Sequence, residues 1–214
     1  MQLWSLYRHL WAVRPWRLVR VGGKRMVHGF STKFEFSIGQ NEIFDINLIK
    51  PTILGCVNVE KTKQLEDRKG VDYKALLRGG AIINIDAKRR EPGASKYWRY
   101  GDPELALEKW SVVPCETCPN GKTGWTLSET SPVDMILYTF DKQDTSKFYL
   151  FPFQHLRMAF IANHKKWKAI YPYKQQKSEE NNRFNLQWKS EAMFVPASVV
   201  IASISEQIAH DCLQ

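Results

Sequence analysis

Two apolar runs joined by a pair of glycines restrict the fold of this chain more than any other feature. Residues 71–77 and 81–88 alternate apolar and polar side chains, and Gly79 and Gly80 lie between them. Alternation with a period of two is typical of β-strands, and two such runs around a glycine-containing loop predict an antiparallel hairpin. Any fold of this chain therefore has to accommodate the hairpin within a sheet.

The second strand of this hairpin has one apolar and one polar face. The apolar face holds Ile83, Ile85 and Ala87, and the polar face holds Asn84, Asp86, Lys88 and Arg90. Burying charged groups is costly unless they have partners. The polar face therefore predicts contact with solvent, a metal ion or a counter-ion.

The length of the hairpin loop decides whether a second acid joins this face. A three-residue loop at 78–80 pairs Leu77 with Ala81 and brings Asp72 opposite Asp86, and such loops favour glycine in the left-handed conformation. A two-residue turn at 79–80 would instead bring Asp72 opposite Ala87. We predict the three-residue loop.

Asp72 and Asp86 on neighbouring strands would form a site of hard oxygen ligands, which suits Mg²⁺ or Mn²⁺. The metal would stabilise charge on a phosphate and help to deliver hydroxide. The Lys88 ammonium would hold the scissile phosphate or the attacking water. The alternative is an ordinary hairpin on which Asp86 and Lys88 form a weak surface pair.

The motifs Val-Asp and Ile-Asp-Ala-Lys, on adjacent strands after an acidic helix, resemble those of the PD-(D/E)xK nuclease superfamily, which includes restriction, phage and repair nucleases. The resemblance implies an α+β fold with a restriction-endonuclease-like core, a mixed central sheet flanked by helices. It implies that Asp72 and Asp86 are the metal acids and Lys88 the catalytic lysine. It also implies a further acid on the preceding helix, with Glu42 as the first candidate and Asp45 as the second. The first motif departs from the family pattern in having Val where Pro is usual.

Two further segments are candidates for contact with nucleic acid. Residues 95–100 combine Lys96 and Arg99 with three aromatic side chains in an expected loop. Phosphate contact and base stacking use these residue types. The resemblance also makes Gln154 and Arg157 candidates for phosphate contact, and the alternative is that they cap and solvate their helix.

The remaining pattern predicts a mixed order of helices and strands. Helices are expected at 37–49, ended by Pro51, at 103–110, capped by Asp102, and at 153–167 and 196–212. Strands are expected at 53–59, paired with 62–67, and at 133–140 and 147–151. Residues 172–187 are expected to be loop.

Positive charge is concentrated at the N-terminus. The 214-residue chain has a net charge of +9, and residues 1–30 contribute six of these charges, with no acid and three tryptophans. This excess favours a polyanionic partner, nucleic acid before an anionic membrane surface. We expect a basic, Trp- and Arg-rich extension at 1–30 and a single nuclease-like domain at 31–214. The extension is interpreted as a DNA-contacting arm, an interfacial helix or an upstream segment without a role.

The cysteines and apolar runs bear on the compartment. Four cysteines are too few for a disulfide framework, so a reducing cytoplasm is expected. Cys115 and Cys118 resemble half of a zinc knuckle, and without a second pair a structural Zn²⁺ is the less favoured interpretation. No apolar run approaches the roughly 18 residues of a membrane-spanning helix, so we expect no integral membrane association.

These patterns together predict a metal-dependent nuclease that acts on nucleic acid, with DNA favoured. One alternative is a non-catalytic basic nucleic-acid-binding module. The other is a peripheral membrane protein anchored by its N-terminal segment. Whether the chain forms a homodimer is left open.

Overall fold

The computed structural model describes residues 42, 44–63, 69–90, 101–116, 118–140, 148–177 and 189–212. These residues form two compact units. Unit 1 takes those up to Arg89 and from Val133 to Leu150, and unit 2 takes those from Arg90 to Pro132 and from Phe151 onward. Both units combine strands with helices, which confirms the predicted α+β class. The extension at 1–30 lies outside the described residues.

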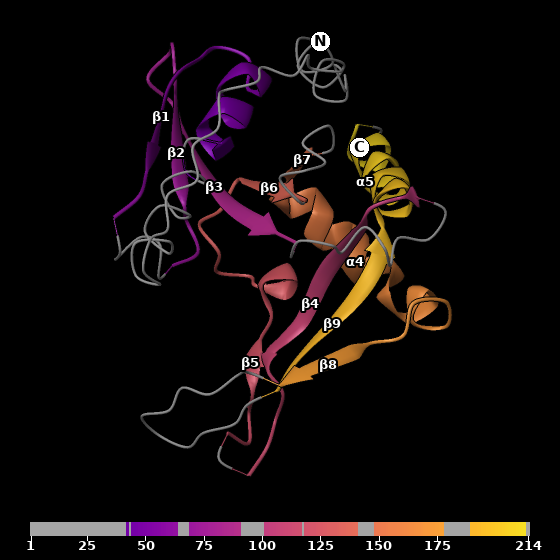
Figure 1. Ribbon diagram of the computed structural model, residues 1–214. Coiled ribbons are helices and arrows are strands. Elements are labelled where there is room, and N and C mark those ends of the chain that lie inside the picture. Colours follow the sequence, from indigo (N-terminus) through magenta and orange to yellow (C-terminus); the bar gives the residue numbers. More distant parts are fainter. Residues whose placement is uncertain are drawn as a thin grey trace, which may run out of the picture. The chain divides into compact units, whose positions relative to one another are not determined.

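Unit 1 is built on a mixed five-stranded sheet with the order β1-β2-β3-β6-β7. Its strands are β1 (Cys56–Lys61), β2 (Tyr73–Leu77), β3 (Ile82–Arg89), β6 (Met135–Thr139) and β7 (Phe148–Pro152). The first three strands pair antiparallel, and β6 lies parallel to β3 (Figure 1). The chain leaves β3 for unit 2 before it returns to β6. The mixed central sheet that the sequence predicts is therefore present.

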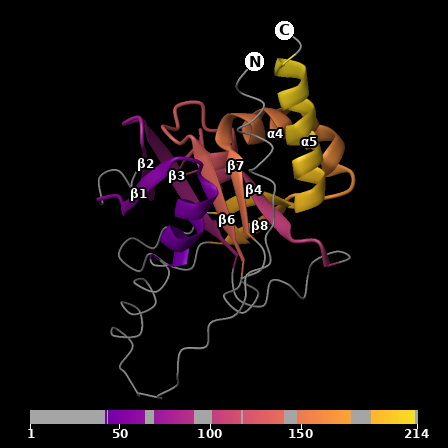
Figure 2. The ribbon, with the colours of Figure 1, turned by 90° about the horizontal axis from the view of Figure 1, so that it is seen from above.

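A helix at 44–52 covers one face of this sheet (Figure 2). Ile49 and Ile53, at and just beyond its end, pack against Tyr73, Ala75 and Ile85 from the hairpin. These hairpin residues are alternate positions on their strands, so they share one face. The apolar face predicted for the second hairpin strand is thus confirmed, and it holds the core of unit 1.

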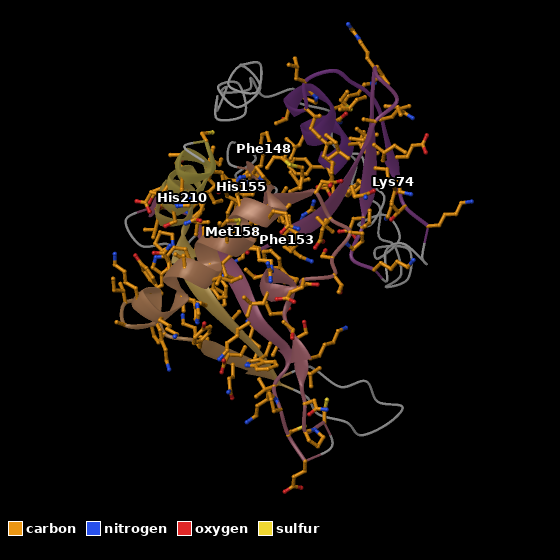
Figure 3. All side chains as sticks on the ribbon, turned by 180° about the vertical axis from the view of Figure 1, so that it is seen from behind. Lys74, Phe148, Phe153, His155, Met158 and His210 are labelled. Carbon is orange, nitrogen blue, oxygen red and sulfur yellow. The ribbon has the colours of Figure 1, made fainter. Side chains whose placement is uncertain are left out.

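Unit 2 has a four-stranded sheet with the order β5-β4-β9-β8, and all the pairings are antiparallel. Its elements are β4 (Glu104–Val112), β5 (Lys122–Thr123), the 3₁₀ helix η3 (Trp125–Leu127), α4 (Phe153–Lys168), β8 (Lys174–Lys177), β9 (Lys189–Pro196) and α5 (Ala197–Asp211). Helices α4 and α5 pack together, and His155 and His210 mark them in Figure 3. Within the described part of the chain, no helix is long and apolar enough to cross a membrane.

Most of the predicted elements are present. The strands predicted at 71–77, 81–88, 133–140 and 147–151 and the helices predicted at 153–167 and 196–212 are confirmed with small shifts of their ends. The first helix runs through Pro51 instead of ending before it. The Thr52 hydroxyl donates to the Leu48 carbonyl at 2.7 Å, and the Ile53 N–H donates to the Ile49 carbonyl at 3.1 Å. These bonds continue the last turn around the proline.

The helix predicted at 103–110 is wrong, because this segment is strand β4. Leu105 and Leu107 are fully buried at alternate positions, and their partners on β9 lie almost ninety residues further along the chain. Asp102, predicted to cap that helix, instead caps α5. Its Oδ2 accepts hydrogen bonds from the Ser198 N–H at 3.2 Å and from the Ser198 hydroxyl at 2.5 Å.

Two further expectations need correction. The strand predicted at 53–59 exists as β1, but its partner is β2 and not 62–67, of which 64–67 lie outside the described residues. The loop predicted at 172–187 contains strand β8, which pairs with β9. In both cases the partner is the next strand along the chain, about a dozen residues away, so the composition of the segment alone did not show the pairing.

Candidate active site

The β2–β3 hairpin has the register that a three-residue loop predicts. Tyr73 pairs with Ile85, and the Leu77 N–H donates to the Ala81 carbonyl at 2.9 Å. Gly80 adopts the left-handed conformation, with φ of 82°, and its N–H donates to the Leu77 carbonyl at 2.9 Å. A residue with a side chain is strained in this conformation, so the loop depends on this glycine. Asp72 directly precedes β2, and its N–H donates to the Ile85 carbonyl at 2.9 Å, next to Asp86.

Asp72, Asp86 and Lys88 are thereby brought together on one face of the hairpin. Asp72 Oδ2 accepts a hydrogen bond from the Ala87 N–H at 2.7 Å, and Lys88 Nζ lies 2.7 Å from Asp86 Oδ2. Burial raises the pKa of the Asp72 carboxyl, the Ala87 N–H opposes this rise, and the neighbouring Asp86 carboxyl adds to it. The carboxyls of Asp72 and Asp86 are therefore close enough to influence each other electrostatically.

The charges of this cluster do not balance. Asp86 is only 5% exposed, and the Lys88 side chain is about one-third exposed. Lys88 offsets one of the two carboxylates, and the second negative charge remains next to the first. Two carboxylates side by side repel each other unless a proton or a cation joins them. The arrangement is chemically suited to a divalent cation that both acids bind.

Protein ligands beyond these two acids are few. Among the residues that the structure describes, no group of three or more His, Cys, Asp or Glu side chains is placed to hold a metal ion. Mg²⁺ is commonly bound by one or two carboxylates and keeps several waters. The pair of Asp72 and Asp86 is therefore compatible with Mg²⁺, whereas Zn²⁺ would need more protein ligands.

Asp45, the second candidate for the helix acid, belongs to a different cluster on the opposite face of the hairpin. The Tyr73 hydroxyl donates to Asp45 Oδ2 at 2.9 Å, and Arg89 Nη2 donates to Asp45 Oδ1 at 2.5 Å. Arg89 also donates to the Thr139 hydroxyl at 3.1 Å. Burial raises the pKa of Asp45, and both Arg89 and Tyr73 oppose that rise. Tyr73 and Arg89 alternate with Asp72 and Lys88, so strand geometry separates the two clusters.

Glu42, the first candidate for the helix acid, lies 3.6 Å from Lys61 Nζ. Both side chains are more than one-third exposed, so this pair is weak. The Asp72 carboxylate contributes to the raised pKa of Asp45, whereas among the described residues the ion-pair partner of Glu42 is Lys61. The role of Glu42 as a further metal ligand stays a prediction.

The structure describes two of the four residues predicted to contact nucleic acid. Lys96 and Arg99 lie outside the described residues. Gln154 is exposed in the first turn of α4. Arg157 donates to Glu129 Oε1 at 2.8 Å and to the Leu127 carbonyl at 3.5 Å, so its guanidinium connects α4 to the segment after η3. A role for it in phosphate contact would compete with that ion pair.

Cys115 and Cys118 face each other across a tight turn. The N–H of each donates to the carbonyl of the other at 3.1 Å, and the Gly121 N–H donates to the Cys118 carbonyl at 2.9 Å. Neither forms a disulfide bond, nor do Cys56 and Cys212. The turn has the compact form of a knuckle, and a structural Zn²⁺ there stays the less favoured interpretation.

Sequence reasoning missed the partners of Asp45. Tyr73 and Arg89 directly follow Asp72 and Lys88, so the alternation that assigns the two metal acids to one face also assigns these two residues to the other. A helix acid above that face could have been matched to them from the pattern alone.

Comparisons with protein families, with curated proteins and with solved structures find no match for this chain.

Proposed function

We propose that this protein is a metal-dependent nuclease that hydrolyses phosphodiester bonds in nucleic acid, with DNA as the favoured substrate. One observation carries the proposal: Asp72, bonded to the Ala87 N–H, lies close enough to Asp86 to interact with it, and Lys88 Nζ is 2.7 Å from Asp86. Two neighbouring carboxylates are suited to Mg²⁺ or Mn²⁺. The basic net charge of the chain is consistent with a polyanionic substrate.

Each residue of the site has a distinct role in this proposal. Asp72 and Asp86 hold the metal, which when bound supplies a Lewis acid and a water of lowered pKa. The Ala87 N–H fixes one oxygen of Asp72, so the carboxylate needs little reorganisation to bind a cation. Lys88 presents a partly exposed ammonium beside Asp86, where it stabilises charge that develops on the phosphate.

A non-catalytic nucleic-acid-binding module is the competing function. The ion pair of Asp86 and Lys88 supports it, because a bonded pair at 2.7 Å is stable without any metal. In that case the second acid, Asp72, would carry a proton, in line with the direction of its pKa shift. A reducing cytoplasm is the expected place of action under either function.

The test is single-turnover cleavage and equilibrium binding with the same proteins. The substrates are single-stranded DNA, duplex DNA and RNA of one sequence, with Mg²⁺, with Mn²⁺ and with chelator. We expect the wild type to cleave at least one substrate only when the metal is present. Asp72→Asn and Asp86→Asn should each abolish cleavage while the proteins stay folded and bind the substrate.

Asp134→Asn is the matched control for these variants. Asp134 is an exposed acid of unit 1 whose carboxylate accepts a hydrogen bond from the Asn84 N–H at 2.7 Å, and asparagine can keep that bond. It should cleave like the wild type. Binding of every substrate without metal-dependent cleavage would favour the binding module. Cleavage at wild-type rates by both Asp variants would refute the site even in a proven nuclease.

A further inference from the structure

Unit 2 brings two cations over one aromatic ring. Arg90 Cζ lies 4.6 Å from the centroid of the Phe194 ring on β9, and Lys174 Nζ from β8 lies 5.1 Å from the same centroid. Both distances are within the roughly 6 Å over which a cation is attracted to an aromatic ring. The two cationic centres are therefore no more than about 10 Å apart, so they repel each other even at moderate ionic strength.

This cluster lies on the partly open face of the four-stranded sheet. Met193 and Val195 are fully buried, and Phe194 between them points to the other face and is half-buried. Lys174 pairs with Ala192, two residues from Phe194, so both belong to this second face. Lys174 is exposed. A ligand can therefore reach the cations from solvent.

Neither cation has an acidic partner within the described part of the chain. Arg90 Nε is buried and has no hydrogen-bond partner there either. A buried donor without an acceptor is unfavourable, the more so on a charged group. The cluster therefore combines three unfavourable features: two like charges close together, no counter-charge, and an unsatisfied guanidinium N–H.

Lys109, a third cation of the same unit, also lies beside aromatic rings but has an acid as its partner. Its ammonium lies 5.8 Å from the Trp110 ring centroid and 5.2 Å from that of Tyr173, and it also has Glu191 at 3.9 Å. Burial and the negative charge of the nearby Glu191 raise the pKa of Tyr173 to about 12. Arg90 and Lys174 have the ring but lack the acid.

We infer that Arg90 and Lys174 form a phosphate-binding subsite for the backbone of a nucleic acid. A phosphate bound by both side chains would offset the two positive charges. Arginine binds phosphate through its planar fork and lysine as a point charge, so the pair offers complementary contacts. The inference rests on the proposed function. Arg90 follows Lys88 by two residues in the sequence.

The test is the salt dependence of binding to a single-stranded DNA of about 12 nucleotides, in chelator so that no cleavage occurs. Each phosphate contact to single-stranded DNA contributes about 0.7 to the slope of log K against log salt. The double variant should lower the slope by about 0.7, because the two residues share one phosphate, and Arg90→Gln and Lys174→Gln alone should each lower it by no more than that. Lys63→Gln, which removes an exposed charge from unit 1, is the matched control and should change the slope little.

Several results would overturn the inference. The slope of the double variant could equal that of the control, or it could fall by about 1.4, which would mean two separate phosphates. Inorganic phosphate could bind the wild type and not the double variant while the DNA slope stays unchanged, which would indicate a small-anion site. Arg90→Lys, which keeps the charge, should retain the slope; loss of the slope in this variant would point to a structural role.

The experiment separates this inference from the proposed nuclease function. If the wild type never cleaves and the salt slope falls in the double variant, the phosphate subsite is supported and the nuclease function is rejected. If Asp86→Asn abolishes cleavage and the salt slope is unchanged in the double variant, the nuclease function is supported and the phosphate subsite is rejected.

Discussion

The β2–β3 hairpin carries a cluster of acid and cation on each of its faces, and the two clusters differ in charge balance. On the helix side, Asp45 has one cation, Arg89, and one hydroxyl, from Tyr73. On the other side, Asp72 and Asp86 share the single ammonium of Lys88 as their described ion-pair partner. The first cluster is neutral, and the second retains a negative charge when both acids are ionised.

Burial does not distinguish the two clusters, because Asp45 is 4% exposed and Asp86 is 5% exposed. The difference is that the donors around Asp45 satisfy it within the protein, whereas the pair of Asp72 and Asp86 is complete only with a further cation or proton. A balanced buried cluster stabilises the fold. An unbalanced one indicates where a ligand binds, and the following predictions test this distinction.

The largest expected effect concerns two adjacent cations, Lys88 and Arg89. On the proposed function, Lys88→Ala should lower single-turnover cleavage by on the order of a hundredfold, the scale of losing one positioned electrostatic group. Arg89→Ala, under conditions in which it is folded, should retain most of the activity, because Arg89 faces the helix. Equal losses in the two variants would contradict the separation of the clusters.

The second effect concerns stability and reverses the order of the same two variants. Arg89→Ala leaves the buried Asp45 carboxylate without its cation and should lower the free energy of unfolding by about 2 kcal/mol. Lys88→Ala should cost less, because its side chain is partly exposed and water can replace it. Urea denaturation in chelator measures both. A greater loss in Lys88→Ala would mean that its cluster is the structural one.

The third effect is stabilisation by metal. If Asp72 and Asp86 bind Mg²⁺ only in the folded state, Mg²⁺ at ten times its dissociation constant should raise the free energy of unfolding by about 1.4 kcal/mol. The gain should disappear in Asp86→Asn and persist in Asp45→Asn. Thermal unfolding with and without Mg²⁺ tests this, and an equal gain in all three proteins would reveal a site elsewhere.

The smallest effect is a dependence of stability on pH. Burial raises the pKa of Asp45 in the folded protein, so the group favours folding most below its unfolded pKa, and this contribution is lost as the pH rises through the folded pKa. The side chain in Asp45→Asn cannot ionise, so the free energy of unfolding of this variant should rise relative to that of the wild type as the pH rises. The gain stays below about 1.4 kcal/mol per pH unit, the value for one proton.

Urea denaturation of both proteins at several pH values between mild acid and neutrality measures this gain. If the free energy of unfolding of the variant instead falls relative to the wild type as the pH rises, the attraction of Arg89 outweighs the effect of burial on Asp45. The balanced cluster would then depend on its ionised form.

The sequence by itself determined the local part of the candidate site. Alternating side chains on 71–77 and 81–88, with Gly80 in the loop, were enough to predict the two strands and their register. These features depend on neighbouring residues and on a short loop whose backbone geometry is confined to a few conformations. For the same reason, the helices with apolar residues at helical spacing, α4 and α5, were predicted correctly.

Only the tertiary structure decided the features that depend on distant partners. Segment 103–110 has mixed local preferences, and it is a strand because β9 supplies hydrogen bonds and a buried face for Leu105 and Leu107. The partner of Arg90 over the Phe194 ring is Lys174, more than eighty residues away. Contacts of this kind depend on the packing of whole strands, which periodicity along a single segment does not encode.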